Sequence, residues 1–191
     1  NAAFHIGRRI YQQLTGPLYR SFSTVSSIMV GQALGEGDAV EARYIATVIL
    51  AISVLTLSVV GGVLVAGAEQ LVAVFTGVPT TRGHAIAFTR AFGVSMVFFG
   101  IFFPLAGALR GAGDTRTPFH ARLIGALGVM LGGSYLLGIV LGHGLAGVYL
   151  SIVLSYASWA VIVGAGFRWG DWADQAALMM AERAKTEEDS G

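Results

Sequence analysis

The chain has 191 residues, of which 54% are hydrophobic and 12% are charged, whereas soluble domains carry about 25% charged residues. Its mean hydropathy is +0.69, and it contains 27 glycines and no cysteine. Too few ionic groups are present to cover the surface of a soluble domain of this size, and disulfide or thiolate chemistry is excluded. The net charge of +1 by itself excludes no class of partner.

Three long stretches without Asp, Glu, Lys or Arg predict membrane-spanning helices: residues 44–68, 91–109 and 123–167. A spanning helix needs about 20 mostly apolar residues, so each stretch holds one span and the last holds two, divided at 142–144. A more polar helix precedes them. The predicted fold class is therefore all-α, a polytopic membrane protein with five helices over residues 3–34, 39–66, 85–109, 118–141 and 145–167.

Residues 1–172 are predicted to form one transmembrane helical lobe, followed by a tail over 173–191 with a helix-prone part at 177–184. Residues 69–75 are too few to span and are expected to form an interfacial turn. Because helices alternate in direction, most basic residues fall on one side, which the positive-inside rule makes cytoplasmic. We expect a multi-pass protein of the cell membrane with a cytoplasmic C-terminus. The basic residues of that side are Arg43, Arg110, Arg116, Arg122, Arg168, Arg183 and Lys185.

Two interhelical loops carry the same pattern, Gly-x-Gly-Asp, at residues 35–38 and 111–114. Glycine commonly follows a helix C-terminus, where a left-handed backbone is needed. The shared pattern indicates a repeated helix-loop-helix plan. We expect the first glycine of each loop, Gly35 and Gly111, to be required for membrane yield.

The residues after each loop predict how the next helix begins. Asp38 is a predicted N-cap, with Glu41 three residues later completing a capping box. In the second loop Thr117 is the predicted cap, with Pro118 at the first helical position, where proline is favoured.

Around these loops the sequence resembles a known family. Residues 30–38 read Val-Gly-Gln-Ala-Leu-Gly-Glu-Gly-Asp, and residues 109–118 read Leu-Arg-Gly-Ala-Gly-Asp-Thr-Arg-Thr-Pro. Both are similar to loop motifs of the multidrug and toxic compound extrusion (MATE) transporters, and residues 167–172 resemble the end of their last helix. We assign a structural role to the motif residues Gly31, Gln32, Gly35, Gly37, Asp38, Arg110, Gly111, Gly113, Asp114 and Pro118.

The resemblance implies a transporter of two six-helix lobes that exports organic cations or other toxic compounds in exchange for Na⁺ or H⁺. This chain resembles the second lobe from its second helix onward. Because it begins with Asn1, and not Met, we expect it to be part of a longer protein whose N-terminal lobe is its partner. All 11 acidic residues lie in loops, at helix ends or in the tail, so the coupling ion is expected to bind in the other lobe. No metal or cofactor is predicted.

The first helix and the third are the predicted walls of a substrate pathway. The first has a polar face and a Gly-Pro pair at 16–17 that should kink or open it. The third has a cluster of Phe residues, whose rings can hold lipophilic cations. Alternatively, the arginines snorkel to the interfaces and the rings face lipid or the core. The candidates are Arg9, Gln12, Gln13, Tyr19, Arg20, Phe98, Phe99 and Phe102.

The last two helices are interpreted as packing elements, with a polar pathway along their small residues as the alternative. Pairs of small residues spaced four apart, such as Gly128 and Gly132, let transmembrane backbones approach closely. A second stripe of small residues is Gly144, Gly147, Ser151, Ser155 and Ser158.

Signals of enzymatic activity are poor. The four histidines lack zinc-ligand spacing, and neither a P-loop nor a nucleophile elbow occurs. The expected partners are membrane lipid and a small-molecule substrate, and no nucleic acid. Three functions stay open: a secondary active efflux transporter working by alternating access, a lipid-linked glycan flippase of a related fold, and a membrane-embedded structural module without transport.

Overall fold

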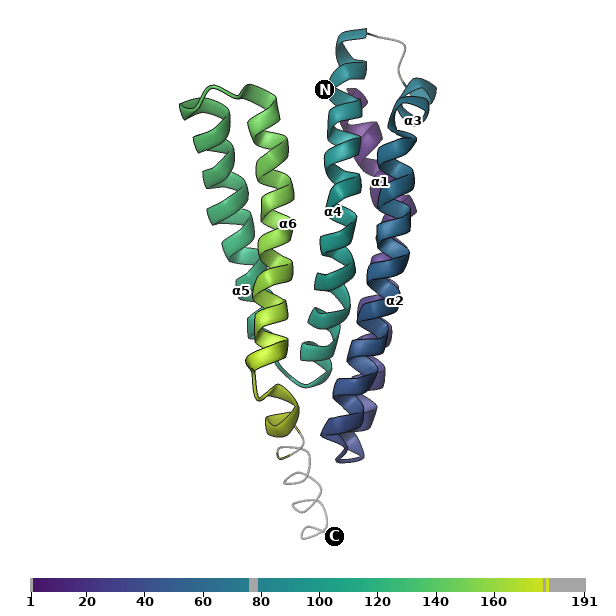
Figure 1. The fold of residues 1–191 in the computed structure, drawn as a ribbon, viewed down its shortest axis with the longest axis vertical. Coiled ribbons are helices and arrows are strands. Elements are labelled where there is room, and N and C mark those ends of the chain that lie inside the picture. The colour runs from purple at the N-terminus through teal and green to yellow at the C-terminus, as the bar shows by residue number, and fades with distance from the viewer. Residues whose placement is uncertain (1, 76–78, 177, 179–191) are drawn as a thin grey trace.

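The chain forms a bundle of long helices (Figure 1). The computed structural model describes the backbone of residues 2–75, 79–176 and 178, and the side chains of 16–74, 82–176 and 178. The described elements are α1 (Ala2–Gly35), α2 (Ala39–Ala66), α3 (Ala68–Phe75), α4 (Pro79–Gly111), α5 (Arg116–Leu123), the π-helical stretches η1 (Ile124–Gly132) and η2 (Ser134–Val140), and α6 (Gly144–Trp169).

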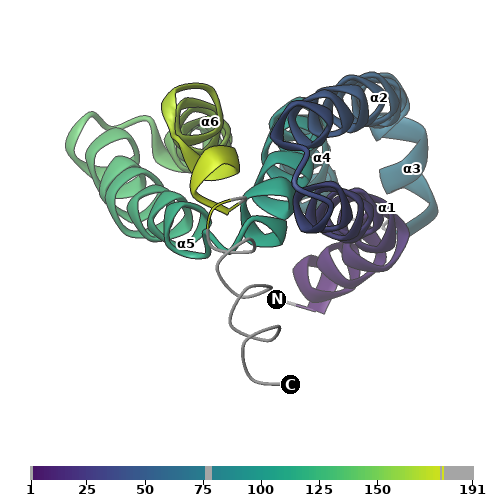
Figure 2. The same cartoon turned by 90° about the horizontal axis from the view of Figure 1, so that it is seen from below.

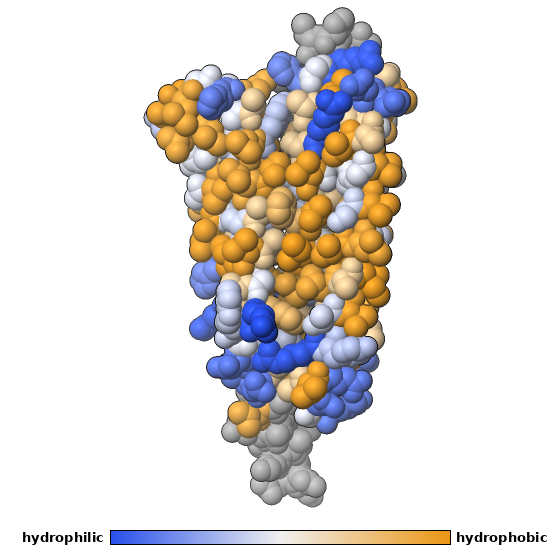
Figure 3. All heavy atoms as spheres, in the orientation of Figure 1, coloured by the Kyte–Doolittle hydropathy of each residue, from blue (hydrophilic) through white to orange (hydrophobic). Residues whose placement is uncertain are grey.

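The all-α membrane fold is confirmed. In the described part of the chain, four helical segments are long and apolar enough to cross a membrane: Ala39–Ala66, Arg82–Gly111, Arg116–Val140 and Gly144–Trp169. On the face shown in Figure 3, apolar side chains form a broad band between two more polar ends. The predicted first span exists as the 34-residue α1, but its polar composition keeps it outside this apolar set.

The largest difference between the observed and predicted boundaries lies at the start of α4. α4 begins at Pro79, six residues before the predicted start, and the predicted interfacial turn is the short helix α3. The predicted fourth span is helical from Arg116 to Val140, but much of it has π-helical hydrogen bonding. The chain also stays helical through Pro17, where the Pro17 carbonyl accepts a 2.8 Å hydrogen bond from the Ser21 hydroxyl.

α4 is the central helix of the bundle. It packs against α1 and α2 on one side and against α6 on the other. The molecule therefore divides into a three-helix group, formed by α1, α2 and α4, and a hairpin, formed by α5, η1, η2 and α6, which packs against α4 (Figure 2). Most of the apolar segment of α4 is buried, whereas few residues of the segment from Arg116 to Val140 are buried. The aromatic side chains of α4 therefore reach both groups.

Glycines of α4 bring its backbone directly against α1. A Cβ at Gly107 would collide with the backbone of Ser23, and a Cβ at Gly111 would collide with that of Ser27. Gly31 lies beside Gly111, with 3.5 Å between a Cβ built at Gly31 and the Gly111 carbonyl oxygen. The two sequence motifs therefore meet in space, because Gly31 belongs to the first and Gly111 to the second.

The contact between α4 and α2 is built in the same way. A Cβ at Gly93 would lie 2.9 Å from the Gly61 carbonyl oxygen, and one at Gly100 would lie 2.9 Å from the Val54 Cα. Such small residues let helices approach until van der Waals packing of their backbones replaces side-chain contacts. Sequence analysis placed glycine contacts only in the last two helices and overlooked those of α4.

In the hairpin, the small residues of α6 contact the preceding segment. A Cβ at Gly147 would lie 2.6 Å from the Leu137 carbonyl carbon, and the buried Ser155 hydroxyl donates a 2.7 Å hydrogen bond to the Gly125 carbonyl. The predicted packing stripe on α6 is therefore observed. Gly128 meets no atom within 4 Å of a Cβ built on it, so the predicted role for that glycine is wrong.

The two Gly-x-Gly-Asp loops have the same backbone geometry. Gly37 and Gly113 have φ of +81° and +87°. The following amides, of Asp38 and Asp114, donate to carbonyls five residues earlier at 3.0 and 2.8 Å. This is the Schellman arrangement, in which a left-handed residue ends the helix. The left-handed residue is the second glycine of each loop, so Gly35 does not hold that position.

Aspartate caps the next helix in both loops. The Asp38 carboxylate accepts a 2.8 Å hydrogen bond from the Glu41 amide, as predicted. The Asp114 carboxylate accepts 3.0 Å hydrogen bonds from the amides of Arg116 and Thr117. The prediction that Thr117 caps α5 is wrong, because the helix begins at Arg116, two residues before the predicted first residue Pro118, and Asp114 satisfies its first amides.

The chain after α6 folds back onto the bundle. The Trp172 indole donates a 3.0 Å hydrogen bond to the Phe167 carbonyl, and its ring lies 5.2 Å from the Arg43 guanidinium. Trp172, Ala173 and Ala176 are buried with the core, so tight packing extends into the first residues of the predicted tail. The predicted tail helix at 177–184 lies outside the described residues, apart from Leu178.

The two loop glycines give a matched test of this packing. Gly111→Ala should destabilise the protein by about 1–3 kcal/mol, because the new Cβ overpacks the α1–α4 contact. Gly35→Ala should leave stability unchanged or raise it by up to about 1 kcal/mol, because a Cβ there meets no atom within 4 Å and alanine favours the helix. Thermal unfolding of the two detergent-purified variants measures the difference. Equal loss of stability in both variants would contradict the conclusion that Gly111, and not Gly35, is packed directly against a neighbouring helix.

Candidate substrate cavity

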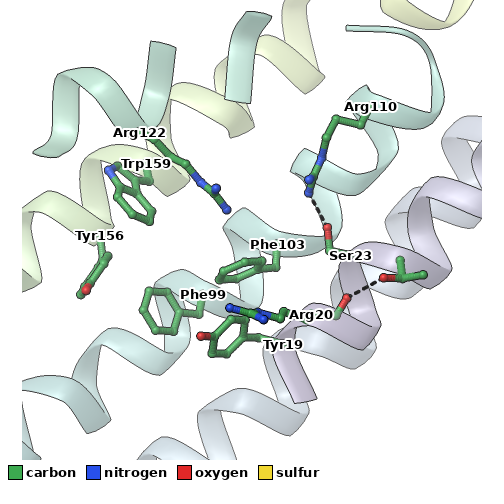
Figure 4. A pocket seen from close by; sticks show the side chains of 10 residues that line it. Tyr19, Arg20, Ser23, Phe99, Phe103, Arg110, Arg122, Tyr156 and Trp159 are labelled. Atoms are coloured by element: carbon green, nitrogen blue, oxygen red, sulfur yellow. Dashed lines mark hydrogen bonds between the residues drawn. The ribbon is translucent and has the colours of Figure 1, made fainter. Parts of the chain in front are cut away.

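The cavity lies where α1, α4, α5 and α6 converge, between the three-helix group and the hairpin (Figure 4). Its volume of about 550 Å³ is within the range of sites for drug-sized ligands. The lining residues are Tyr19, Arg20, Ser23, Thr24, Phe99, Phe103, Arg110, Arg122, Tyr156 and Trp159.

Aromatic rings from three helices form one wall. Tyr19 of α1 lies 4.2 Å from Phe103 and 5.3 Å from Phe99, between ring centroids. Phe99 in turn meets Tyr156 of α6 edge to face at 4.6 Å. Tyr156 meets Trp159 at 5.1 Å. These separations are those of favourable aromatic pairs, so the wall is a continuous, interlocked apolar surface.

Arg110 is held at the end of the cavity nearest the second Gly-x-Gly-Asp loop by hydrogen bonds to neutral groups. Its Nε donates to the Ala106 carbonyl at 2.9 Å, and its Nη2 donates to the Ser23 hydroxyl at 2.6 Å. Ser23 is also the residue whose backbone packs on Gly107. The close approach of α1 and α4 therefore brings the Ser23 hydroxyl within reach of Arg110.

Arg122 lies over aromatic rings on the opposite side. Its guanidinium carbon is 5.2 Å from the centroid of Phe102, 5.7 Å from Trp159 and 5.9 Å from Phe103. Cation–π contacts stabilise a charged side chain by about 0.5–2 kcal/mol. A Cβ at Gly125 would collide with the Trp159 indole, so this glycine allows Trp159 to pack close to the start of η1.

The charge of the cavity is positive. Arg20, Arg110 and Arg122 line it, and none of its lining residues in the described part of the chain is acidic. In the described ranges of the chain the two ion pairs lie elsewhere, Arg43 with Asp174 at 3.4 Å and Arg90 with Glu69 at 2.9 Å. Charges inside a membrane protein normally face a partner or a water-filled space, and here three of one sign face the same space.

The sequence-predicted pathway residues fall into three groups. Tyr19, Arg20 and Phe99 line the cavity together. Phe98 is partly buried outside the lining, and Phe102 is buried behind it, beneath Arg122. The remaining three lie on the N-terminal part of α1, where the structure describes the backbone alone: Arg9, Gln12 and Gln13.

Seven of the ten lining residues were not among the predicted pathway residues: Ser23, Thr24, Phe103, Arg110, Arg122, Tyr156 and Trp159. Arg122 was counted among the basic residues of the predicted cytoplasmic side, and Tyr156 and Trp159 belong to a helix interpreted chiefly as a packing element. Tyr156 and Trp159 are three residues apart and share a helix face, which was an available signal. Their approach to Arg122 depends on how the hairpin folds, which no local pattern reports.

Long apolar helices around an amphipathic cavity define the chain as part of a multi-pass α-helical membrane protein. The MatE family model matches residues 2–136, more than half of the chain. The chain therefore belongs to the MatE family, and the resemblance carried by the loop motifs is confirmed.

Individual relatives agree with this assignment. The chain is 30% identical over 143 residues to the multidrug resistance protein NorM of Burkholderia vietnamiensis, covering 72% of this chain and 31% of that protein. It is 27% identical over 143 residues to a probable NorM of Burkholderia pseudomallei strain K96243, with the same coverage of each chain. The crystal structure of the eukaryotic MATE transporter AtDTX14 superimposes with a TM-score of 0.81 at 19% identity, over 95% of this chain and 39% of that one. The chain thus spans about a third of each relative's length.

Cysteine labelling tests whether the cavity is open to water. Thr24 lines the cavity, and Ile52 is an exposed apolar residue of α2. Both lie about 16–20 Å along their helices from the loop that joins them. Thr24→Cys should react with a charged methanethiosulfonate at least about tenfold faster than Ile52→Cys, because thiolate formation needs water. The rates are measured in the complete gene product in membranes, with other cysteines replaced by serine. Equal rates would mean that the cavity is closed or that α2 does not face lipid.

Proposed function

We propose that this chain is part of a secondary active efflux transporter that exports amphipathic compounds in exchange for Na⁺ or H⁺. The observation that carries the proposal is the cavity at the junction of α1, α4, α5 and α6, which combines an aromatic wall with charged groups. Family membership and the multidrug resistance names of the NorM relatives support the same function. On this proposal the chain contributes to the second of two lobes, in the cell membrane, with the C-terminus in the cytoplasm.

The division of the bundle suggests how alternating access would operate. The three-helix group and the hairpin each have a tight internal contact made by glycine or serine, and they meet at α4. Rocking of packed helical groups around a central site is the common mechanism of secondary transporters. In this proposal the cavity opens to one side of the membrane at a time, while the internal contacts of each group persist.

The coupling ion is proposed to bind outside this chain. Coupling sites usually need an ionisable group inside the membrane, and the acidic residues of the described apolar segments lie only near helix ends, as Glu41 does in α2. A carboxylate of the other lobe would then bind Na⁺ or H⁺. Within this chain the transport chemistry is limited to holding the substrate and changing its exposure.

A lipid-linked glycan flippase is the second candidate function. The three arginines of the cavity favour it, because such substrates carry phosphate groups that arginine binds well. No observation on the described residues favours a structural module without transport.

Transport into proteoliposomes tests the exporter proposal. The complete gene product should move an amphipathic fluorescent compound in the presence of a Na⁺ or pH gradient, and uptake should fall to the background of protein-free vesicles when an ionophore removes the gradient. A panel with an anionic, a neutral and a cationic compound covers the substrate classes. Absence of gradient-dependent movement of every compound would refute the proposal, and gradient-independent lipid translocation would favour the flippase.

A further inference from the structure

The three arginines of the cavity lack acidic partners in the described part of the chain. Arg110 bonds to a carbonyl and a hydroxyl. Arg122 contacts aromatic rings, and the Arg20 side chain forms no ion pair or hydrogen bond with the described residues. Like charges that line one cavity repel each other. All three arginines are exposed residues that line the same cavity, and such a cluster of like charges is stabilised when an anion enters.

The arginines retain hydrogen-bonding capacity toward such an anion. A guanidinium has five N–H donors in a planar fork, and the two bonds of Arg110 occupy only part of this set. Arg122 is placed by contacts with ring faces, so its in-plane donors stay available. Arginine forks match the geometry of carboxylate and phosphate oxygens.

A lipophilic cation fits the same cavity poorly. Binding it would place a fourth positive charge among Arg20, Arg110 and Arg122. The ring faces of Phe102, Phe103 and Trp159 that would attract it are already near the Arg122 guanidinium, at 5.2–5.9 Å. Electrostatics therefore selects against cations at this position.

We propose that the cavity binds the oxyanion of an amphipathic anion. Arg20, Arg110 and Arg122 hold a carboxylate, phosphate or sulfonate group, and the apolar body lies against the aromatic wall of Tyr19, Phe99 and Phe103. This inference gives the substrate class of the proposed exporter and rests on that function. The cavity of about 550 Å³ accommodates one or two fused rings with their charged group.

Two probes with the same ring system and opposite fixed charge test the inference. They are 2-naphthalenesulfonate and 2-naphthyltrimethylammonium, and their Kd values for the purified complete gene product are measured by calorimetry. We expect the anion to bind at least tenfold more tightly than the cation. Arg20→Gln, Arg110→Gln and Arg122→Gln should each weaken anion binding about tenfold or more, as expected for loss of a charge-assisted hydrogen bond, while cation binding stays the same or improves.

Arg116→Gln is the matched control, because Arg116 is exposed at the start of α5 and outside the lining. It should leave both Kd values unchanged. Tighter binding of the cation by the unmodified protein, or anion binding that is insensitive to all three cavity substitutions, would overturn the inference. Anion binding would be insensitive to the three substitutions if carboxylates from the rest of the protein neutralise the arginines.

A second measurement avoids dependence on variants that fold poorly. The Thr24→Cys protein is labelled with anionic sulfonatoethyl methanethiosulfonate and with the cationic trimethylammonioethyl reagent, and the ratio of the two rates is compared with the ratio for a small free thiol. We expect the anionic-to-cationic rate ratio to be at least tenfold higher in the protein, because the arginines attract the anionic reagent. A ratio equal to that of the free thiol would overturn the inference. Competition with bound 2-naphthalenesulfonate distinguishes a lipid headgroup from a soluble anion as the natural ligand. Competition by dioctanoyl phosphatidate alone indicates a lipid, and competition by 2-naphthyl phosphate alone indicates a soluble substrate.

The outcomes separate this inference from the exporter proposal. Gradient-driven transport of cations with no anion preference would overturn the inference and leave the exporter function standing. Anion binding that depends on the arginines, without gradient-driven transport of any compound, would leave the site standing and refute the exporter.

Discussion

The close contact between α1 and α4 is the constraint on which the cavity depends. Gly107 and Gly111 place the α4 backbone directly on the backbone of Ser23 and Ser27. At this separation Arg110 reaches the Ser23 hydroxyl. A single added methyl group would push the helices apart, because packed interiors absorb extra volume poorly. Most of the stability of this contact comes from dispersion between close backbones, since lipid offers no hydrophobic advantage to helix association.

Local features of the fold were predictable because they depend on few neighbouring residues. Length and hydropathy fix the apolar helices, and α2 has the predicted bounds, Ala39–Ala66. The Gly-x-Gly-Asp loops were recognisable because a Schellman ending needs a glycine at a set position. The choice between the two glycines of each loop was not predictable, since it depends on where each helix ends. Gly37 and Gly113 hold the positive φ, whereas Gly111 is required for contact with another helix.

Features that depend on helix pairing were not predictable from one sequence. The seven-residue spacing of Gly93, Gly100 and Gly107 is visible in the chain, but it does not say that Gly93 and Gly100 face α2 while Gly107 faces α1. The same problem affected the aromatic residues. Phe99 and Phe103 line the cavity, whereas Phe98 does not, and periodicity alone cannot choose among faces when lipid and core are both apolar.

The cavity joins this packing to function through its charge. Arg110 lies on the helix that the glycines position, and Arg122 lies on the hairpin over rings contributed by both groups. Any relative movement of the three-helix group and the hairpin would change the spacing of the arginines. A ligand that bridges them would therefore bind one arrangement better than another, which is how a substrate can bias a conformational equilibrium.

The most direct test of this account is a cryo-electron microscopy structure of the complete gene product in lipid nanodiscs with 2,3,5-triiodobenzoate, an aromatic carboxylate with heavy, easily located atoms. The account predicts ligand density against the aromatic wall, with the carboxylate within hydrogen-bonding distance of at least two of Arg20, Arg110 and Arg122. Density elsewhere, or arginines paired with carboxylates from the rest of the protein around an empty cavity, would contradict it.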